Sequence, residues 1–140
     1  MTRPLPRPTD AELAILRVLW TRGPSTVRHV HEALSEARDT GYTTTLKLMQ
    51  IMAEKGLLTR DERARTHIYS VRLTQDQTQR QLVSDLMDRA FGGSAAALVM
   101  QALNAQSATP GELAEIQRLI EQYKNEDPNS PDNDEEEIAL

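Results

Sequence analysis

A chain of 140 residues and 15.7 kDa can hold one ordinary domain, or one small domain with an appendage. Zero cysteines exclude a disulfide framework and a thiolate metal site, and the lack of any run of about 18 apolar residues excludes a membrane-spanning helix. The net charge of −5 is unevenly divided, because residues 1–73 hold 12 basic and 8 acidic side chains whereas residues 74–140 hold 4 and 13. The basic front half can therefore contact phosphates although the whole chain is acidic.

Two amphipathic helices are expected at the start of the chain. Thr9 and Glu12 have the spacing of a capping box, in which a hydroxyl and a carboxylate each accept a bond from a free backbone N–H at a helix start. A Gly-Pro pair predicts the end of the first helix, and Ser25 is the expected N-cap of the second, which ends in the polar stretch 38–41. Their apolar faces, interpreted as core, consist of Leu13, Leu16, Leu19 and Trp20, and of Val27, Val30 and Leu34.

The third predicted helix, over residues 42–56, has two different faces. At about 100° per residue, one half of the cylinder holds Leu46, Leu48, Met49, Met52 and Ala53, with Thr45 among them. The other half holds Thr43, Thr44, Lys47 and Gln50. No acid occurs in this helix before Glu54. A face with hydroxyls, an amide and a cation but no carboxylate suits phosphates and base edges, so we interpret it as a DNA-recognition surface.

Residues 57–71 predict a β-hairpin with a basic tip. Its second strand, over residues 66–71, alternates polar and apolar side chains, with Ile68 on one side and His67 and Tyr69 on the other. Three helices followed by this two-stranded wing have the order of a winged helix-turn-helix, a DNA-binding arrangement. The fold class is therefore expected to be mainly α, with the winged helix first.

Each exposed side chain of the third helix has a candidate role in DNA binding. Thr43 and Thr44 can bond a phosphate or touch a thymine methyl group. Lys47 can pair with a phosphate or with guanine, and Gln50 with adenine or a phosphate. One protomer offers few such contacts, so its binding would be weak and sensitive to salt. Doubling the contacts in a dimer is the physical reason to expect that firm DNA binding depends on dimerisation.

Further candidate contacts lie on the wing and at the start of the second helix. Arg63, Arg65 and Arg60 suit phosphate contacts, although the acids at positions 61 and 62 also fit a solvated hairpin. Ser25 and Thr26 open the second helix, whose N-terminal amides can receive a phosphate. Capping of the helix by Ser25 without any DNA contact is the alternative.

Three more helices are predicted over residues 74–91, 94–105 and 109–124. Thr74 and Thr109 mark two starts, and a Gly-Gly pair at 92–93 marks an end. These helices have too few large side chains for a core of their own, whereas two copies can pool their apolar faces. We therefore predict an intertwined dimerisation region, in which the contacts are made by Leu82, Leu86, Phe91, Leu98, Val99, Leu103, Leu113, Ile116 and Ile120.

The expected organisation has three parts. Residues 1–73 form a winged-helix DNA-binding domain and residues 74–124 a three-helix dimerisation domain. Residues 125–140 hold seven acids and no bases, and are expected to be a disordered tail. We interpret the tail as a solubility device; the alternative is a mimic of nucleic acid that competes for the basic face.

Four segments together resemble one family of bacterial transcriptional regulators. They are residues 12–20, residues 42–58 with YTTTLK and EKGLL, residues 65–69 with RTHIY, and residues 91–99 with FGG. Over roughly residues 7–124 the chain resembles the penicillinase/methicillinase repressor family. The resemblance implies homodimers with an N-terminal winged helix and a C-terminal helical dimer region, which bind palindromic operators and repress transcription.

The resemblance also implies a route to derepression. In the best-known branch, a membrane sensor-protease system triggers cleavage of the repressor in its dimer region. The corresponding point falls near Gln101-Ala102, where this chain lacks the Asn-Phe-like pair of some members. The cysteine pairs of a copper-responsive branch are absent as well.

We therefore predict a cytoplasmic homodimeric repressor of double-stranded operator DNA that is not an enzyme. No nucleophile elbow, Gly-rich phosphate loop or metal-ligand spacing occurs, and no cofactor is expected. His29 and His31 lie two positions apart and do not share a helix face, which argues against a metal site. Two alternatives remain: a winged-helix regulator that senses a small molecule, and a protein–protein adaptor that never touches DNA.

Overall fold

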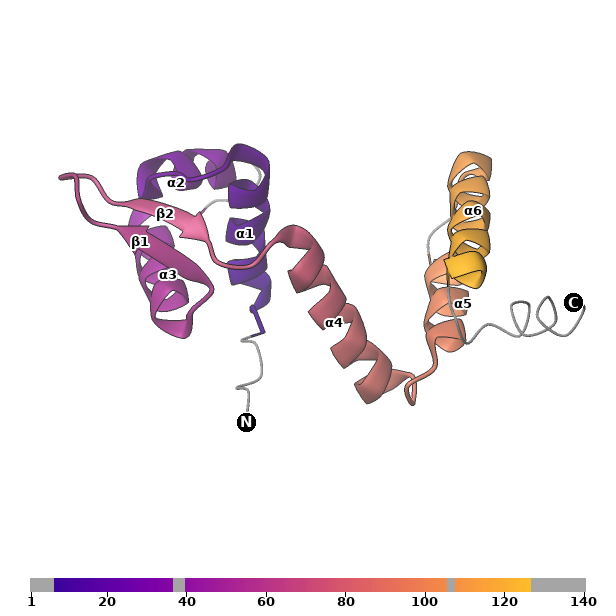
Figure 1. The fold of residues 1–140 in the computed structure, drawn as a ribbon. Helices are drawn as coiled ribbons and strands as arrows, with labels where there is room; N and C mark the ends of the chain where they lie inside the picture. Colours follow the sequence, from indigo (N-terminus) through magenta and orange to yellow (C-terminus); the bar gives the residue numbers. More distant parts are fainter. Residues whose placement is uncertain (1–6, 37–39, 106–107, 127–140) are drawn as a thin grey trace, which may run out of the picture. The chain divides into compact units, whose positions relative to one another are not determined.

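The computed structural model describes residues 7–36, 40–105 and 108–126. Contacts between backbone segments divide the chain after Gly93 into an N-terminal unit and a C-terminal unit (Figure 1). Within the described ranges, no helix combines the length and the apolar character needed to cross a membrane. Each unit is described by itself below.

Three helices begin the N-terminal unit: α1 (Asp10–Arg22), α2 (Val27–Ser35) and α3 (Tyr42–Lys55). The predicted capping box starts α1, since the backbone N–H of Glu12 donates to Thr9 Oγ1 over 3.2 Å and that of Thr9 to Glu12 Oε1 over 2.9 Å. Helix α2 ends ahead of the predicted stretch 38–41, of which residues 38 and 39 lie outside the described residues. The three helices pack on one another and bury Ile15, Leu16, Leu19, Val27, Val30, Leu34, Met49 and Met52.

The predicted hairpin is present as β1 (Leu58–Asp61) and β2 (Ile68–Val71). The strands are antiparallel and place Leu58 opposite Val71 and Arg60 opposite Tyr69. Tyr69 is the side chain that β2 turns into the core, where it is 1% exposed, while Ile68 is half-buried. The arrangement of three helices followed by a two-stranded wing is that of a winged helix (Figure 1).

The wing is fixed to the turn between α1 and α2 by a backbone bridge that the sequence did not indicate. The N–H of Ser25 donates to the carbonyl of Tyr69 over 3.0 Å, and the N–H of Tyr69 to the carbonyl of Ser25 over 2.8 Å. The prediction that Ser25 is the N-cap of α2 is therefore wrong. Thr26 caps the helix instead, because its hydroxyl accepts the N–H of His29 over 3.2 Å.

Helix α3 ends at Gly56, where the backbone turns back toward the wing. Gly56 has φ of 86°, in the left-handed region that favours glycine, and its N–H bonds the last turn of the helix. A Cβ on this residue would lie 3.2 Å from Arg72 Nη1. The next two residues, Leu57 and Leu58, are buried, so the turn commits the start of the wing to the core.

Helix α4 (Gln75–Ala90) also belongs to the N-terminal unit by its contacts. Thr74 caps it, in a capping box with Gln77. The indole N–H of Trp20, which is half-buried against the core, donates to the carbonyl of Leu73 over 3.3 Å and links α1 to the residue before this cap. Whether residues 74–124 act together as one dimerisation domain stays a prediction.

The C-terminal unit contains α5 (Ala95–Ala105) and α6 (Pro110–Glu126). The predicted start of α6 is present in part, because the N–H of Glu112 donates to Thr109 Oγ1 over 3.1 Å. Helix α6 includes the first two residues of the predicted tail, and residues 127–140 lie outside the described residues. Neither helix buries a single described residue, although both carry apolar side chains.

Candidate nucleic-acid interface

The two faces of α3 are divided as the sequence predicts. Thr45, Met49 and Met52 are buried in the core, while Leu46, Leu48 and Ala53 are half-buried against it. The opposite face exposes all four candidate residues, which are Thr43, Thr44, Lys47 and Gln50. Contact of these residues with DNA stays a prediction, but each side chain is free to reach a ligand in solvent.

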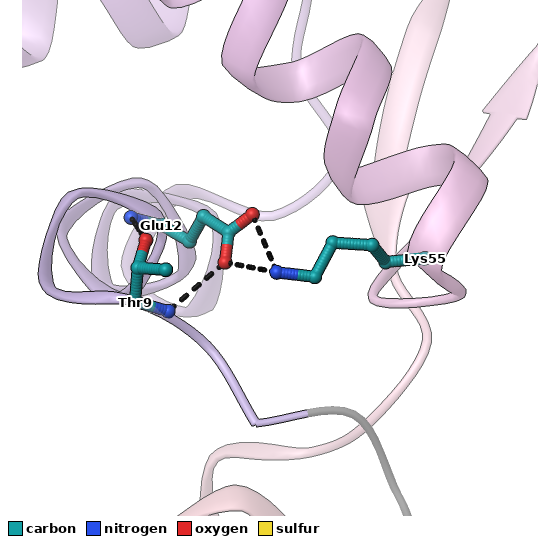
Figure 2. A network of polar contacts seen from close by, with 3 residues as sticks. All are labelled: Thr9, Glu12 and Lys55. Atoms are coloured by element: carbon teal, nitrogen blue, oxygen red, sulfur yellow. Dashed lines mark hydrogen bonds and ion pairs between the residues drawn. The ribbon is translucent and has the colours of Figure 1, made fainter.

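An ion pair between the buried carboxylate of Glu12 and the partly exposed ammonium of Lys55 holds the C-terminal end of α3 to the start of α1 (Figure 2). Lys55 Nζ donates to Glu12 Oε1 over 2.7 Å and to Oε2 over 3.0 Å, and Oε1 also accepts the N–H of Thr9. The Glu12 side chain is 2% exposed. Burial alone would raise the pKa of Glu12, yet the bonds from Lys55 and Thr9 outweigh it and lower the pKa below its ordinary value. This carboxylate is therefore charged at neutral pH and fixes where α3 lies on α1.

A groove of about 590 Å³ lies between the start of α2, the first half of α3 and the wing. Five cationic or ionisable nitrogen side chains line it: Arg28, His29, Arg60, Arg65 and His67. Among the lining residues there is no carboxylate. Arg28 and His29 were missed as candidates because the sequence alone places them on a helix of otherwise mixed polarity. The signal that could have identified them is their place in the first turn of α2, two and three residues after the cap Thr26.

The wing carries two ion pairs of its own. Arg63 forms a forked pair with Asp61, in which Nη2 donates to Oδ2 over 2.8 Å and Nε to Oδ1 over 3.0 Å. The bonds from the Arg63 side chain and then from its backbone N–H lower the pKa of Asp61 to about 2. Arg60 likewise pairs with Glu62. Two of the three predicted wing cations are thus matched with acids of the hairpin.

Three candidate cations have no carboxylate partner among the described residues: Arg28, Lys47 and Arg65. They come from α2, α3 and the wing, respectively. Arg28 and Arg65 line the same groove, and Lys47 lies on the exposed face of α3. These unpaired cations are the ones able to take a phosphate without first breaking an ion pair.

The two candidates at the start of α2 have different positions. Ser25 is 5% exposed and donates its hydroxyl to the carbonyl of Gly23 over 2.9 Å, so its side chain does not reach the surface. Thr26 lines the groove, with its hydroxyl on the N–H of His29. Of this pair, Thr26 alone is placed to meet a ligand.

The residues predicted to make the dimer lie on α4, α5 and α6 and in the turn after α4. Five of them are exposed in the single chain: Leu86, Val99, Leu103, Leu113 and Ile120, with exposed fractions from 37% to 50%. The other four are half-buried: Leu82, Phe91, Leu98 and Ile116. Gln101 and Ala102, at the expected cleavage point, are exposed within α5.

No group of three or more metal-ligating side chains occurs in the part of the chain that the structure describes. His31 packs edge-on against Tyr42, with ring centroids 5.6 Å apart. His29 and His67 share the groove, and no carboxylate is among its lining residues. The arrangement of nitrogen side chains fits an anion, since protonated nitrogens attract phosphate.

Comparison with known proteins finds the family described as Penicillinase repressor, which matches residues 8–122. The transcriptional regulator BlaI of Mycobacterium tuberculosis is 40% identical over 98 residues, which are 68% of this chain and 71% of that protein. The penicillinase repressor of Bacillus licheniformis is 21% identical over 121 residues, 86% of this chain and 94% of that one.

Two solved structures also resemble the chain. One is the solution structure of the DNA binding domain of the repressor BlaI, with a TM-score of 0.47, 23% identity, and coverage of 54% of this chain and 90% of that one. The other is the Bacillus licheniformis BlaI monomeric form in complex with the blaP half-operator, with a TM-score of 0.46 and 22% identity. It covers 51% of this chain and 88% of that chain.

Proposed function

Because the chain belongs to the penicillinase repressor family, we propose that it is a homodimeric transcriptional repressor that binds a palindromic operator in double-stranded DNA. The family is one of transcriptional repressors and not of enzymes. The relatives include a protein described as bound to a half-operator, and a half-operator is one arm of a two-armed site. We infer by analogy that this chain also binds operator DNA.

The observation that carries the proposal is the exposed face of α3. Its first three turns hold no carboxylate, and they present Thr43, Thr44, Lys47 and Gln50 to solvent. A recognition helix enters the major groove with its N-terminal residues foremost. Gln50 and Lys47 are then able to read base edges, each good bidentate contact being worth about 1–3 kcal/mol of discrimination.

The charge on one protomer explains why a dimer is needed. With three unpaired cations, one each on α2, α3 and the wing, and a salt slope of roughly 0.9 per neutralised phosphate, one protomer binds weakly and loses DNA readily in salt. A second copy doubles these contacts and adds a second half-site. The exposed apolar side chains of α4, α5 and α6 supply the surface that two copies would cover in each other.

Derepression follows from the same dependence on pairing. Any event that disrupts α5 or α6 separates the two half-site contacts, so affinity falls although the DNA-binding surface is unchanged. Proteolysis within α5, where Gln101 and Ala102 are exposed, is such an event. The partner would then be a protease, for example a membrane sensor-protease, that acts on the dimer region.

A band shift with the DNA upstream of the gene that encodes the chain tests the proposal. At about 50 mM salt, where phosphate attraction is strong, wild type should shift this DNA in preference to a scrambled duplex. The double variant Thr44→Ala with Lys47→Ala should lose the preference while sedimenting as a dimer. Arg17→Ala, which removes an exposed cation on α1 outside the groove, is the matched control and should bind normally.

Two outcomes would overturn the proposal. Absence of any shift at low salt would favour a protein–protein adaptor. A chain that is monomeric at micromolar concentration and still binds its operator at full strength would remove the need for the dimer.

A further inference from the structure

The groove between α2, α3 and the wing has a composition that recognition of bases does not require. Recognition of base edges needs the exposed face of α3, yet the groove adds Arg28, Arg60 and Arg65 beside it together with the imidazoles of His29 and His67. Tyr42 and Gln50 of α3 line the same groove and join it to the recognition face. A ligand that lies along α3 therefore passes the groove as well.

The electrostatics of the groove select an anion. Arg28 and Arg65 have no carboxylate partner among the described residues. Arg60 forms an ion pair with Glu62, but Glu62 does not line the groove. Guanidinium groups bind phosphate through two parallel N–H···O bonds. In a winged helix whose third helix lies in the major groove, the anion that reaches this position is a phosphodiester of the DNA backbone.

We propose that this groove is the binding site of an operator phosphate, which Arg28 and Arg65 hold, and that His29 and His67 make operator affinity depend on pH. The proposal rests on the function proposed above and specifies how its DNA contact is regulated. Both histidines line the groove, His29 from α2 and His67 from the wing, so both can lie close to the same anion.

At such a site, binding of the phosphate and protonation of the imidazoles favour each other. The charged and titratable groups that line the groove with the imidazoles are Arg28 on α2, Tyr42 on α3, and Arg60, Arg65 and Tyr69 on the wing. A phosphate favours an imidazolium over a neutral imidazole, so arrival of the DNA draws protons onto the groove. Imidazoles titrate near pH 6.5 as a class. Affinity should accordingly be high at pH 6 and fall as the pH rises to 8.

Fluorescence anisotropy of a labelled operator duplex with the full-length dimer tests this, at constant ionic strength from pH 6.0 to pH 8.0. Wild type should lose affinity roughly tenfold over this range, about the effect of one pKa unit of linkage. The variant His29→Gln with His67→Gln should vary less than about twofold, at the affinity that wild type has near pH 8. Both side chains are exposed, so the fold is expected to survive; equal thermal melts verify it.

His31→Gln is the matched control, because the third histidine lies on α2 outside the groove lining. Its variant should keep the pH dependence of wild type. Operator binding with the same pH dependence in the double variant as in wild type would overturn this inference and leave the repressor function intact. Failure of every variant and of wild type to bind at any pH would instead overturn the proposed function.

Discussion

Helix α5 is more apolar than helix α1, yet α1 is the helix with buried residues. Helix α1 contains charged residues along its length, yet it buries Ile15, Leu16 and Leu19 and even the carboxylate of Glu12. Helix α5 contains only two polar residues, Gln101 and Asn104, yet it buries none. Burial therefore depends on partners within reach and not on how apolar a helix is. The N-terminal unit supplies such partners from α2, α3 and the wing, whereas α5 and α6 bury none of their described residues, and we expect a second copy to cover them.

The largest expected effect comes from breaking the surface that the second region leaves uncovered. Leu103→Glu puts a charge at a half-exposed apolar position of α5, where a second copy is expected to pack. The dimer should dissociate and operator affinity should fall by on the order of 100-fold through lost avidity. Sedimentation and anisotropy measure the two quantities.

Gln101→Glu adds the same charge to the same helix without removing an apolar side chain, and it serves as the control. It should leave the sedimentation coefficient and the affinity close to those of wild type. Equal loss of the dimer in both variants would show that the added charge on α5 disrupts the dimer, and not the loss of an apolar contact.

A change inside the core of the N-terminal unit should alter the stability of the fold and not the pairing of two chains. Glu12→Gln removes the buried carboxylate that Lys55 and Thr9 bond, at a cost of about 2 kcal/mol in the free energy of unfolding. Denaturant titration gives this value. Glu54→Gln, at an exposed position of α3, should stay within about 0.5 kcal/mol of wild type.

The same ion pair has a pH dependence of known sign. Because the pKa of Glu12 is lowered in the folded chain, its contribution is present above the pKa of an unfolded glutamate and is lost as the pH falls through the lower, folded value. The difference in unfolding free energy between wild type and Glu12→Gln should be constant near neutrality and shrink below about pH 4. A difference that grows as the pH falls would contradict the assigned bonds.

An unpaired wing cation should matter to binding alone. Arg65→Ala removes a guanidinium that has no carboxylate partner among the described residues, so operator affinity should fall about fivefold and the salt slope by about 0.9 per protomer. Thermal stability should not change. An unaltered salt slope would place this arginine away from the phosphates.

The smallest expected effect has the opposite direction. Asp61→Asn releases Arg63 from its forked ion pair and removes a negative charge from the wing, so affinity for any duplex should rise about twofold at low salt. Because the pKa of Asp61 is about 2, wild type carries this charge throughout the working pH range. Weaker binding by the variant would mean that the pair itself shapes the wing for DNA.

Local patterns were sufficient for the elements and for the faces of α3. The capping box of α1 and the glycine ends of α1, α3 and α4 need only neighbours within a turn, and periodicity placed Thr45 with the core and Lys47 outside it. The predicted N-cap of α2 was off by one residue, because the bridge between Ser25 and Tyr69 occupies the backbone of Ser25. That bridge joins positions far apart in the chain, which no local pattern encodes.

The sequence by itself determined which stretches are helical and which side of α3 carries hydroxyls, an amide and a cation. Only the tertiary structure decided that Lys55 meets Glu12 across 43 positions, and that Arg28 and His67 line one groove. Caps and periodicity act between residues within a turn or two, whereas these partnerships arise from packing of distant segments. A cation that is unpaired in the sequence can therefore be neutralised in the fold.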